Sequence, residues 1–234
     1  MKDTLYQISL LQAFINGYYD GVENISELKK YGDIGIGTFE GADGEMIMLD
    51  SKVYKAKFDG TIALIEEGLT PFCNVCKFIG KDIIKTNIDN VNQLKTLLNR
   101  YRDMNYKNLF IVIKIKGLFK NISVRSVPKQ NKPYNPFEEV IEHDQKIYTY
   151  KNVEGTLIGF LFPRYLKELN TTDLHMHFLS KDLSCGGHVL DLSFNELTIE
   201  TSIKSDFNLI LPNNDKFNNH NVIVNNTIIK KVEE

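Results

Sequence analysis

The hydrophobic period of the chain changes from helical spacing to strict alternation at Asp33, and this change constrains the fold more than any other feature. Residues 33–60, DIGIGTFEGADGEMIMLDSKVYKAKFDG, alternate apolar and polar side chains in short runs. Turn-forming residues separate the runs at 42–44, 50–51 and 59–60. Alternation with a period of two is typical of β-strands, so the segment predicts a β-meander.

Helices and further strands are predicted on both sides of this meander. Apolar residues at helical spacing predict one helix over residues 4–16 and a second, short helix over residues 25–31. The rest of the chain predicts a strand at 72–80, an amphipathic helix at 88–103, a strand pair at 108–126, a helix at 138–145, strands within 146–162 and 172–202, and a polar segment at 206–234 that ends in a short helix. The predicted fold class is therefore α/β (α+β), with mixed β-sheets and flanking helices.

A proline-rich stretch, residues 128–137, predicts an ordered loop or a linker. It holds three of the six prolines, and proline lacks the backbone donor that a central strand needs. We place a boundary near residue 150, between an N-terminal mixed-sheet domain (1–150) and a C-terminal sheet domain with a tail (151–234). A weak similarity between residues 34–49 and 174–192 favours an internal duplication.

Charge and cysteine content argue against several classes of protein. The chain has 28 Lys and Arg against 30 Asp and Glu, a net charge of −2, so its overall charge does not favour nucleic acid or an anionic membrane. The first apolar run is interrupted by Ser9 and Gln12 and does not resemble a signal peptide, and no run is long enough to span a bilayer. We expect a cytoplasmic protein whose three cysteines are free thiols.

Three of the five histidines lie close together, between His175 and His188. His175 and His177 are two residues apart, so on a strand both side chains point to one face. A loop then returns the chain, and a suitable antiparallel register brings His188 beside them. Gly186 and Gly187 permit a close backbone approach or a positive φ next to the third ligand. Three imidazoles with an open fourth position are typical of a catalytic zinc site; the alternative is three polar residues on a solvated strand face.

The other candidate ligands carry weaker signals. His143 and His220 fit surface positions better than a metal site. Cys73 and Cys76 form a CxxC pair without a second such pair, so two small side chains on a buried strand are expected rather than a redox or zinc site. Cys185 lies within the histidine segment and is an alternative fourth ligand, although its neighbours place it at the tip of the turn.

Two charged residues are candidates for binding substrate and moving protons. Arg125 ends the strand pair at 108–126, where its guanidinium can bind a substrate carboxylate through two hydrogen bonds. The alternative is a surface arginine paired with Glu138 or Glu139. Glu45 follows a tight turn and precedes an apolar strand, which suits an acid or base facing a cleft. The alternative is a hairpin-end carboxylate in water.

The sequence resembles the alpha-acetolactate decarboxylase family in three motifs that occur in this order: GIGTFEGADGEMIMLDSKVYKA, VRSVPKQNKPYNPF and LHMHFLSKDLSCGGHVLDL. The resemblance extends from about Leu5 to Glu233. It implies two α/β domains, each with a mixed sheet, that assemble as a homodimer. It also implies a divalent metal, usually zinc, held by His175, His177 and His188.

The resemblance implies roles for further residues. The arginine of the matching motif, Arg125, binds the substrate carboxylate. Thr38 of the GTF motif lines the site, and Glu45 is the glutamate of DGE. The family's C-terminal Ile-x-x-x-Glu pattern selects Glu233 over Glu234 as a second site carboxylate. The three cysteines depart from the usual family pattern without removing a catalytic group.

The activity that the resemblance implies is the metal-dependent decarboxylation of (S)-2-acetolactate to (R)-acetoin and CO2, in acetoin and butanediol formation. Zinc is the expected metal, and no organic cofactor is expected because the substrate's own keto group accepts the electrons. Two alternatives stay open. Another metal-dependent lyase or hydrolase could use the three histidines, but a hydrolase has no use for a carboxylate clamp. A DNA-binding module would need a basic arm that this chain lacks.

Overall fold

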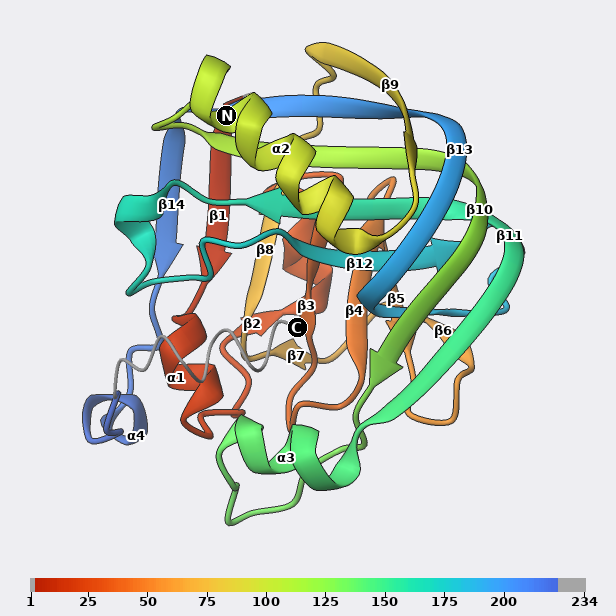
Figure 1. Ribbon diagram of the computed structural model, residues 1–234. Helices are drawn as coiled ribbons and strands as arrows, with labels where there is room; N and C mark the ends of the chain where they lie inside the picture. Colours follow the sequence, from red (N-terminus) through yellow and green to blue (C-terminus); the bar gives the residue numbers. More distant parts are fainter. Residues whose placement is uncertain (1–2, 223–234) are drawn as a thin grey trace.

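The computed structural model describes residues 3–222, which form two large β-sheets, a small two-stranded sheet and few helices (Figure 1). The elements are β1 (Thr4–Ile8), α1 (Leu11–Ile15), β2 (Glu23–Asn24), the 3-10 helix η1 (Ile25–Lys30), β3 (Ile34–Thr38), β4 (Glu45–Leu49), β5 (Lys52–Ala56), β6 (Ile62–Ile65), β7 (Leu69–Thr70), β8 (Cys73–Cys76), β9 (Asp82–Ile88), α2 (Val91–Asn105), β10 (Phe110–Ser126), α3 (Phe137–Asp144), β11 (Lys146–Leu161), η2 (Arg164–Leu166), β12 (His175–Ser180), β13 (Gly186–Lys204), β14 (Asp206–Ile210) and α4 (Asp215–Asn218). The predicted α+β class is confirmed.

The first sheet contains the predicted meander. Its seven strands lie in the order β14-β1-β8-β3-β4-β5-β6. β1 pairs with β14 in parallel. β1 and β8 are antiparallel, as are the successive strands from β3 to β6, so the sheet is mixed. Positive φ angles at Ala42, Gly44, Asp50 and Ser51 make the two tight turns of the meander. These turns fix the register of β3, β4 and β5.

The second sheet is a closed ring of four strands with a fifth strand attached. Its order is β10-β11-β12-β13-β9, and an additional pairing of β10 with β13 closes the ring. β10 is one 17-residue strand, so the predicted strand pair at 108–126 is wrong. The apparent break around Gly117, which has φ +151, bends the strand without reversing it.

The predicted helix over residues 4–16 is wrong in its first half. Residues Thr4–Ile8 form β1, and only Leu11–Ile15 is helical. Ser9 has φ +61, a left-handed conformation that an α-helix cannot contain. β1 also pairs with a strand on each side, β8 and β14. Sheet hydrogen bonds to distant strands therefore override the local helical spacing.

The segment at 206–234, predicted to be polar, contributes β14 to the first sheet. The short helix predicted at its end lies outside the described residues. β11 runs through residue 150, and each sheet takes strands from both sides of that position. The organisation around two main sheets is confirmed, whereas the division of the chain near residue 150 stays a prediction.

The two sheets pack face to face, and their strands cross one another (Figure 1). Because successive residues of a strand point to opposite faces, β10 directs Val112 toward the first sheet and Ile111 and Ile113 toward α2. The core between the sheets consists of Leu5, Ile34, Ile36, Ile47, Ala56, Cys76, Phe110, Val112, Ile158, Phe160, Phe162 and Leu179. Burial of apolar side chains on both faces fixes the second sheet against the first.

The helices cover the outside of this pair of sheets. α2 packs on the second sheet through Leu94 and Leu98, as predicted from its amphipathic pattern. α1 and α3 pack together at one end, in a separate cluster that includes Phe14 and Phe137. Within residues 3–222, no helix is long and apolar enough to cross a membrane.

Candidate metal centre

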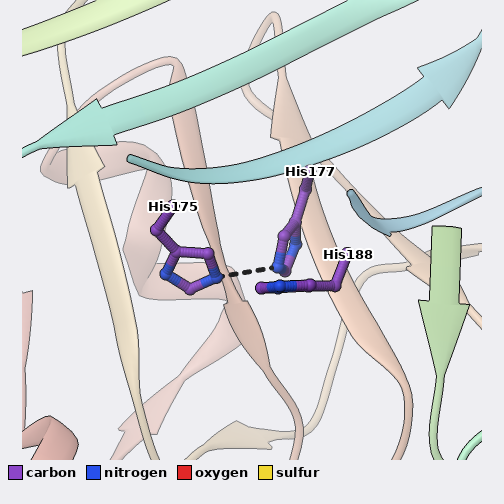
Figure 2. A group of neighbouring side chains, drawn as sticks. All are labelled: His175, His177 and His188. Atoms are coloured by element: carbon purple, nitrogen blue, oxygen red, sulfur yellow. Dashed lines mark hydrogen bonds between the residues drawn. The ribbon is translucent and has the colours of Figure 1, made fainter. Parts of the chain in front are cut away.

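Two neighbouring strands place the three histidines on one face of the second sheet. His175 and His177 alternate with buried apolar residues along β12, and His188 of β13 lies directly opposite His177. Side chains of directly opposite residues lie on the same face of a sheet. One ring nitrogen from each histidine lies within 4.8 Å of the others, and all three side chains are buried. Figure 2 shows the three rings converging, so the predicted register is confirmed.

Arg125 joins the histidines from the third strand, β10. It lies directly opposite His188, on the side of β13 away from β12. A β-bulge in β13 makes this possible, because Leu190 is an extra residue with no partner on β10. Without the bulge, Val189 would face Arg125, and a shift of one residue moves a side chain to the other face. The bulge therefore aligns Arg125, His188 and His177 in one row.

The main chain of the first sheet orients His177. Its Nδ1 donates a hydrogen bond of 2.8 Å to the carbonyl oxygen of Met46. A carbonyl only accepts, so the proton of the neutral ring is on Nδ1 and the lone pair is on Nε2. That Nε2 lies 3.2 Å from Nε2 of His175 (Figure 2). Such a bond from the second ring nitrogen is how proteins fix a metal-binding imidazole.

Burial keeps two of these imidazoles neutral. It lowers the pKa of His175 to about 3, with a further contribution from the positive charge of Arg125. It also lowers the pKa of His177 well below its usual range, and the neighbouring His175 acts in the same direction. A metal binds the neutral imidazole, so neither ring has to lose a proton at neutral pH.

The first sheet contributes a threonine and a carboxylate. Thr38 ends β3 and Glu45 begins β4, directly opposite each other. The Thr38 hydroxyl donates a 2.7 Å hydrogen bond to the carbonyl of Gly44. Glu45 has the same strand parity as Ile47 of the inter-sheet core, so it faces the second sheet. Its Oε2 lies 3.5 Å from Nε2 of His177, and only 9% of its side chain is exposed.

One cavity, of about 30 Å³, connects these residues. Its polar side is formed by the three histidines, Arg125, Glu45 and Thr38. Its apolar side is formed by Leu11 and Phe14 of α1, Phe72 before β8, and Phe137 at the start of α3. A cavity of this size excludes a polymer. The arrangement joins a nitrogen donor set, a carboxylate-binding cation, an acid or base and an apolar wall.

The donor set suits a divalent transition metal. Three imidazole nitrogens without a thiolate are typical of Zn²⁺ and its first-row neighbours, whereas Mg²⁺ and Ca²⁺ prefer oxygen ligands. Cys185 is not part of the histidine group; its side chain packs in the apolar core of the second sheet.

The remaining candidates lie away from the cavity or outside the described residues. Cys73 and Cys76 are free, fully buried thiols on β8, as predicted. Burial raises the pKa of Cys76 to about 12, which makes its thiol unreactive. His143 is exposed on α3 and His220 packs against Tyr18. Glu233 and Glu234 lie outside the described residues.

Sequence reasoning missed the apolar wall of the cavity. Phe14, Phe72 and Phe137 come from three distant segments, and nothing in their spacing brings them together. One local signal exists: Phe72, just before β8, and Phe137, the first residue of α3, each directly follow a proline, Pro71 and Pro136. The carbonyl of Met46 was also missed, because a main-chain partner has no sequence signature.

Comparison with known proteins identifies the family. The family model described as alpha-acetolactate decarboxylase matches residues 5–223. An alpha-acetolactate decarboxylase of Methanosarcina mazei is 39% identical over 222 residues, which cover 93% of this chain and 75% of the relative. The enzyme of Bacillus subtilis strain 168 is 37% identical over 224 residues, which cover 93% of this chain and 85% of the relative.

A crystal structure of the Bacillus subtilis enzyme has the same fold. It superposes with a TM-score of 0.91 at 36% sequence identity, over 98% of this chain and 97% of that chain. The fold and the site thus define a carboxy-lyase, an enzyme that removes CO2 from its substrate. The chain belongs to the alpha-acetolactate decarboxylase family.

Proposed function

We propose that the chain converts (S)-2-acetolactate to (R)-acetoin and CO2, with a divalent metal, Zn²⁺, held by His175, His177 and His188. The observation that carries this proposal is the row of Arg125, His188 and His177 on three adjacent strands, with Glu45 facing it. When bound, the metal supplies a Lewis acid that stabilises negative charge on substrate oxygens. An organic cofactor is unnecessary because the substrate carries its own keto group.

Arg125 binds the substrate carboxylate in this proposal. Its side chain is only 3% exposed, and a buried guanidinium forms strong, directional hydrogen bonds to a carboxylate. Two such bonds fix the plane of the carboxylate and so the direction of the bond that joins it to C2. When that bond breaks, CO2 leaves and the electron pair stays on C2, delocalised into the neighbouring ketone.

Glu45 delivers the proton that completes the reaction. It lies beside His177 and faces the cavity from the first sheet, so its proton reaches the substrate from one side only. Delivery to one face yields a single enantiomer of the product. Thr38 lines the same side, and its hydroxyl is positioned by the Gly44 carbonyl.

Glu233 is the second carboxylate of the proposal, although it lies outside the described residues. The proposal extends to the homodimer and the cytoplasmic location that the family resemblance implies.

The test measures metal content, CO2 and acetoin enantiomers after purified protein is mixed with racemic acetolactate. We expect about one metal per chain and (R)-acetoin as the product. His177→Ala should lose metal and activity, and Arg125→Ala should keep metal and lose turnover. His143→Ala is the matched control, because His143 is an exposed histidine away from the cavity. Metal without CO2 release would leave the three-histidine site and refute the decarboxylase; a metal-free, active wild type would refute the metal requirement.

A further inference from the structure

The apolar wall of the cavity is a rigid aromatic cluster. The ring of Phe14 lies 4.7 Å from that of Phe137 and 6.2 Å from that of Phe72, between ring centroids. All three side chains are at most 5% exposed. Tyr19 packs behind them, 4.9 Å from Phe14 and 6.2 Å from Phe137. Rings that are packed on both sides cannot move away without loss of these contacts, so the wall has a fixed position.

The shape of the substrate determines which of its groups meets this wall. C2 of acetolactate is tetrahedral and carries a carboxylate, a hydroxyl, an acetyl group and a methyl group. The three oxygen-bearing groups are drawn to the polar side of the cavity, to Arg125, the histidines and Thr38. The fourth substituent of a tetrahedral carbon points away from the other three. The C2 alkyl group therefore points toward the apolar side.

We infer that Phe14, Phe72 and Phe137 determine the length of the C2 alkyl group that the enzyme accepts. This inference rests on the proposed function, because it uses the orientation that the polar side gives to the substrate. Phe137 is the residue best suited to a test. It lies at the start of α3, outside both sheets, so its replacement leaves the strands of the polar side intact.

The inference predicts a change in specificity and not merely a loss of activity. One methylene group more than an apolar pocket can hold changes kcat/KM by about 10-fold to 200-fold. We expect the kcat/KM of the wild type to drop by this factor at one step of a series of 2-alkyl-2-hydroxy-3-oxobutanoates with methyl, ethyl, propyl and butyl groups. Phe137→Ala should move the fall to a longer group, and should raise the propyl-to-methyl ratio of kcat/KM by at least about 10-fold.

The experiment measures CO2 release along this series for the wild type, Phe137→Ala, Phe137→Leu and Tyr134→Ala. Phe137→Leu keeps most of the apolar volume and provides a folded variant if the alanine variant does not fold. Tyr134 is the matched control, because it packs against the same cluster but does not line the cavity. Tyr134→Ala should leave the propyl-to-methyl ratio unchanged. A Phe137 variant that lowers kcat/KM by the same factor for every substrate overturns the inference.

A second measurement separates this inference from the proposed function. The 2-alkyl-2,3-dihydroxybutanoates keep an oxygen on C3 but lack the ketone and cannot lose CO2, so their dissociation constants report on contact with the apolar wall without turnover. If affinity falls as the alkyl group lengthens, and Phe137→Ala reduces that fall, the apolar wall limits the alkyl length even if the wild type fails to decarboxylate acetolactate. That result would refute the proposed function alone. An identical affinity profile in the wild type and both Phe137 variants would refute the wall, whether or not acetolactate is turned over.

Discussion

Replacement of Gly187 by alanine is expected to damage the site and the fold together. Gly187 precedes His188 in β13 and has φ +147, a conformation that disfavours a side chain. A Cβ at this position lies 2.6 Å from the backbone carbonyl oxygen of Arg125. The obstacle is main chain and not a flexible side chain, so β10 and β13 must move apart. The prediction that a glycine here permits a close backbone approach is thus confirmed.

The size of the effect follows from the distance. An ordinary van der Waals contact begins at 3.4 Å, so the 2.6 Å contact must lengthen by about 0.8 Å. A misplacement of about 1 Å at a catalytic site costs about 100-fold in rate. We expect kcat/KM for acetolactate to fall by about 100-fold in Gly187→Ala. Backbone strain and crowding together should lower the free energy of unfolding by about 2–6 kcal/mol.

Gly68→Ala is the matched control. Gly68 has φ +122, but a Cβ there meets no atom within 4 Å. In this variant only backbone strain is added, so its free energy of unfolding should fall by about 1–3 kcal/mol while its turnover is unchanged. The assays are CO2 release at saturating metal and urea denaturation for both variants. If Gly187→Ala keeps wild-type turnover and is no less stable than Gly68→Ala, the close contact does not couple β13 to Arg125 and the reasoning is wrong.

Three further predictions concern the polar side of the cavity. Arg125→Lys should keep the metal and lower kcat/KM by about 10-fold to 100-fold, since one charged hydrogen bond is lost; metal analysis beside CO2 release checks this. Glu45→Gln should lower kcat by about 10²-fold to 10⁴-fold and give racemic acetoin; chiral chromatography that still shows pure (R)-acetoin would exclude Glu45 as the proton donor. Burial lowers the pKa of His175 to about 3, so metal-free protein should lose stability as the pH falls from about 6.5 toward 3, where the unfolded chain takes up the proton. Urea denaturation across this pH range should show that the free energy of unfolding falls less for His175→Asn than for the wild type.

The grouping of the three histidines could be predicted because it depends mainly on local geometry. Any strand puts His175 and His177 on one face, and a short return puts His188 within reach. The place of Arg125 could not be predicted in the same way. It depends on the bulge at Leu190, which shifts the register of β13 against β10 by one residue. Such an irregularity arises from packing between strands that lie far apart in the chain.

The same distinction explains the errors in the fold. The meander of residues 33–60 was predicted because its strands are neighbours in the chain, and turns set their register. β1 was mistaken for a helix because its partners, β8 and β14, are distant in the sequence, and the spacing of nearby apolar residues does not indicate such partners. The apolar wall was missed for that reason too, since Phe14, Phe72 and Phe137 meet only in the folded chain.

The parallel pairing of β1 with β14 determines when the first sheet can be completed during synthesis on the ribosome. Thr4 faces Asp206 and Ile8 faces Ile210, so the two strands are separated by about 200 residues of chain. The ribosome releases the N-terminal strand first, and one edge of β1 therefore stays unpaired until residue 210 has emerged. An unpaired edge invites association with other chains, and pairing over such a separation is slow. While the strands that carry the three histidines are being made, this edge of β1 is therefore open to association with other chains.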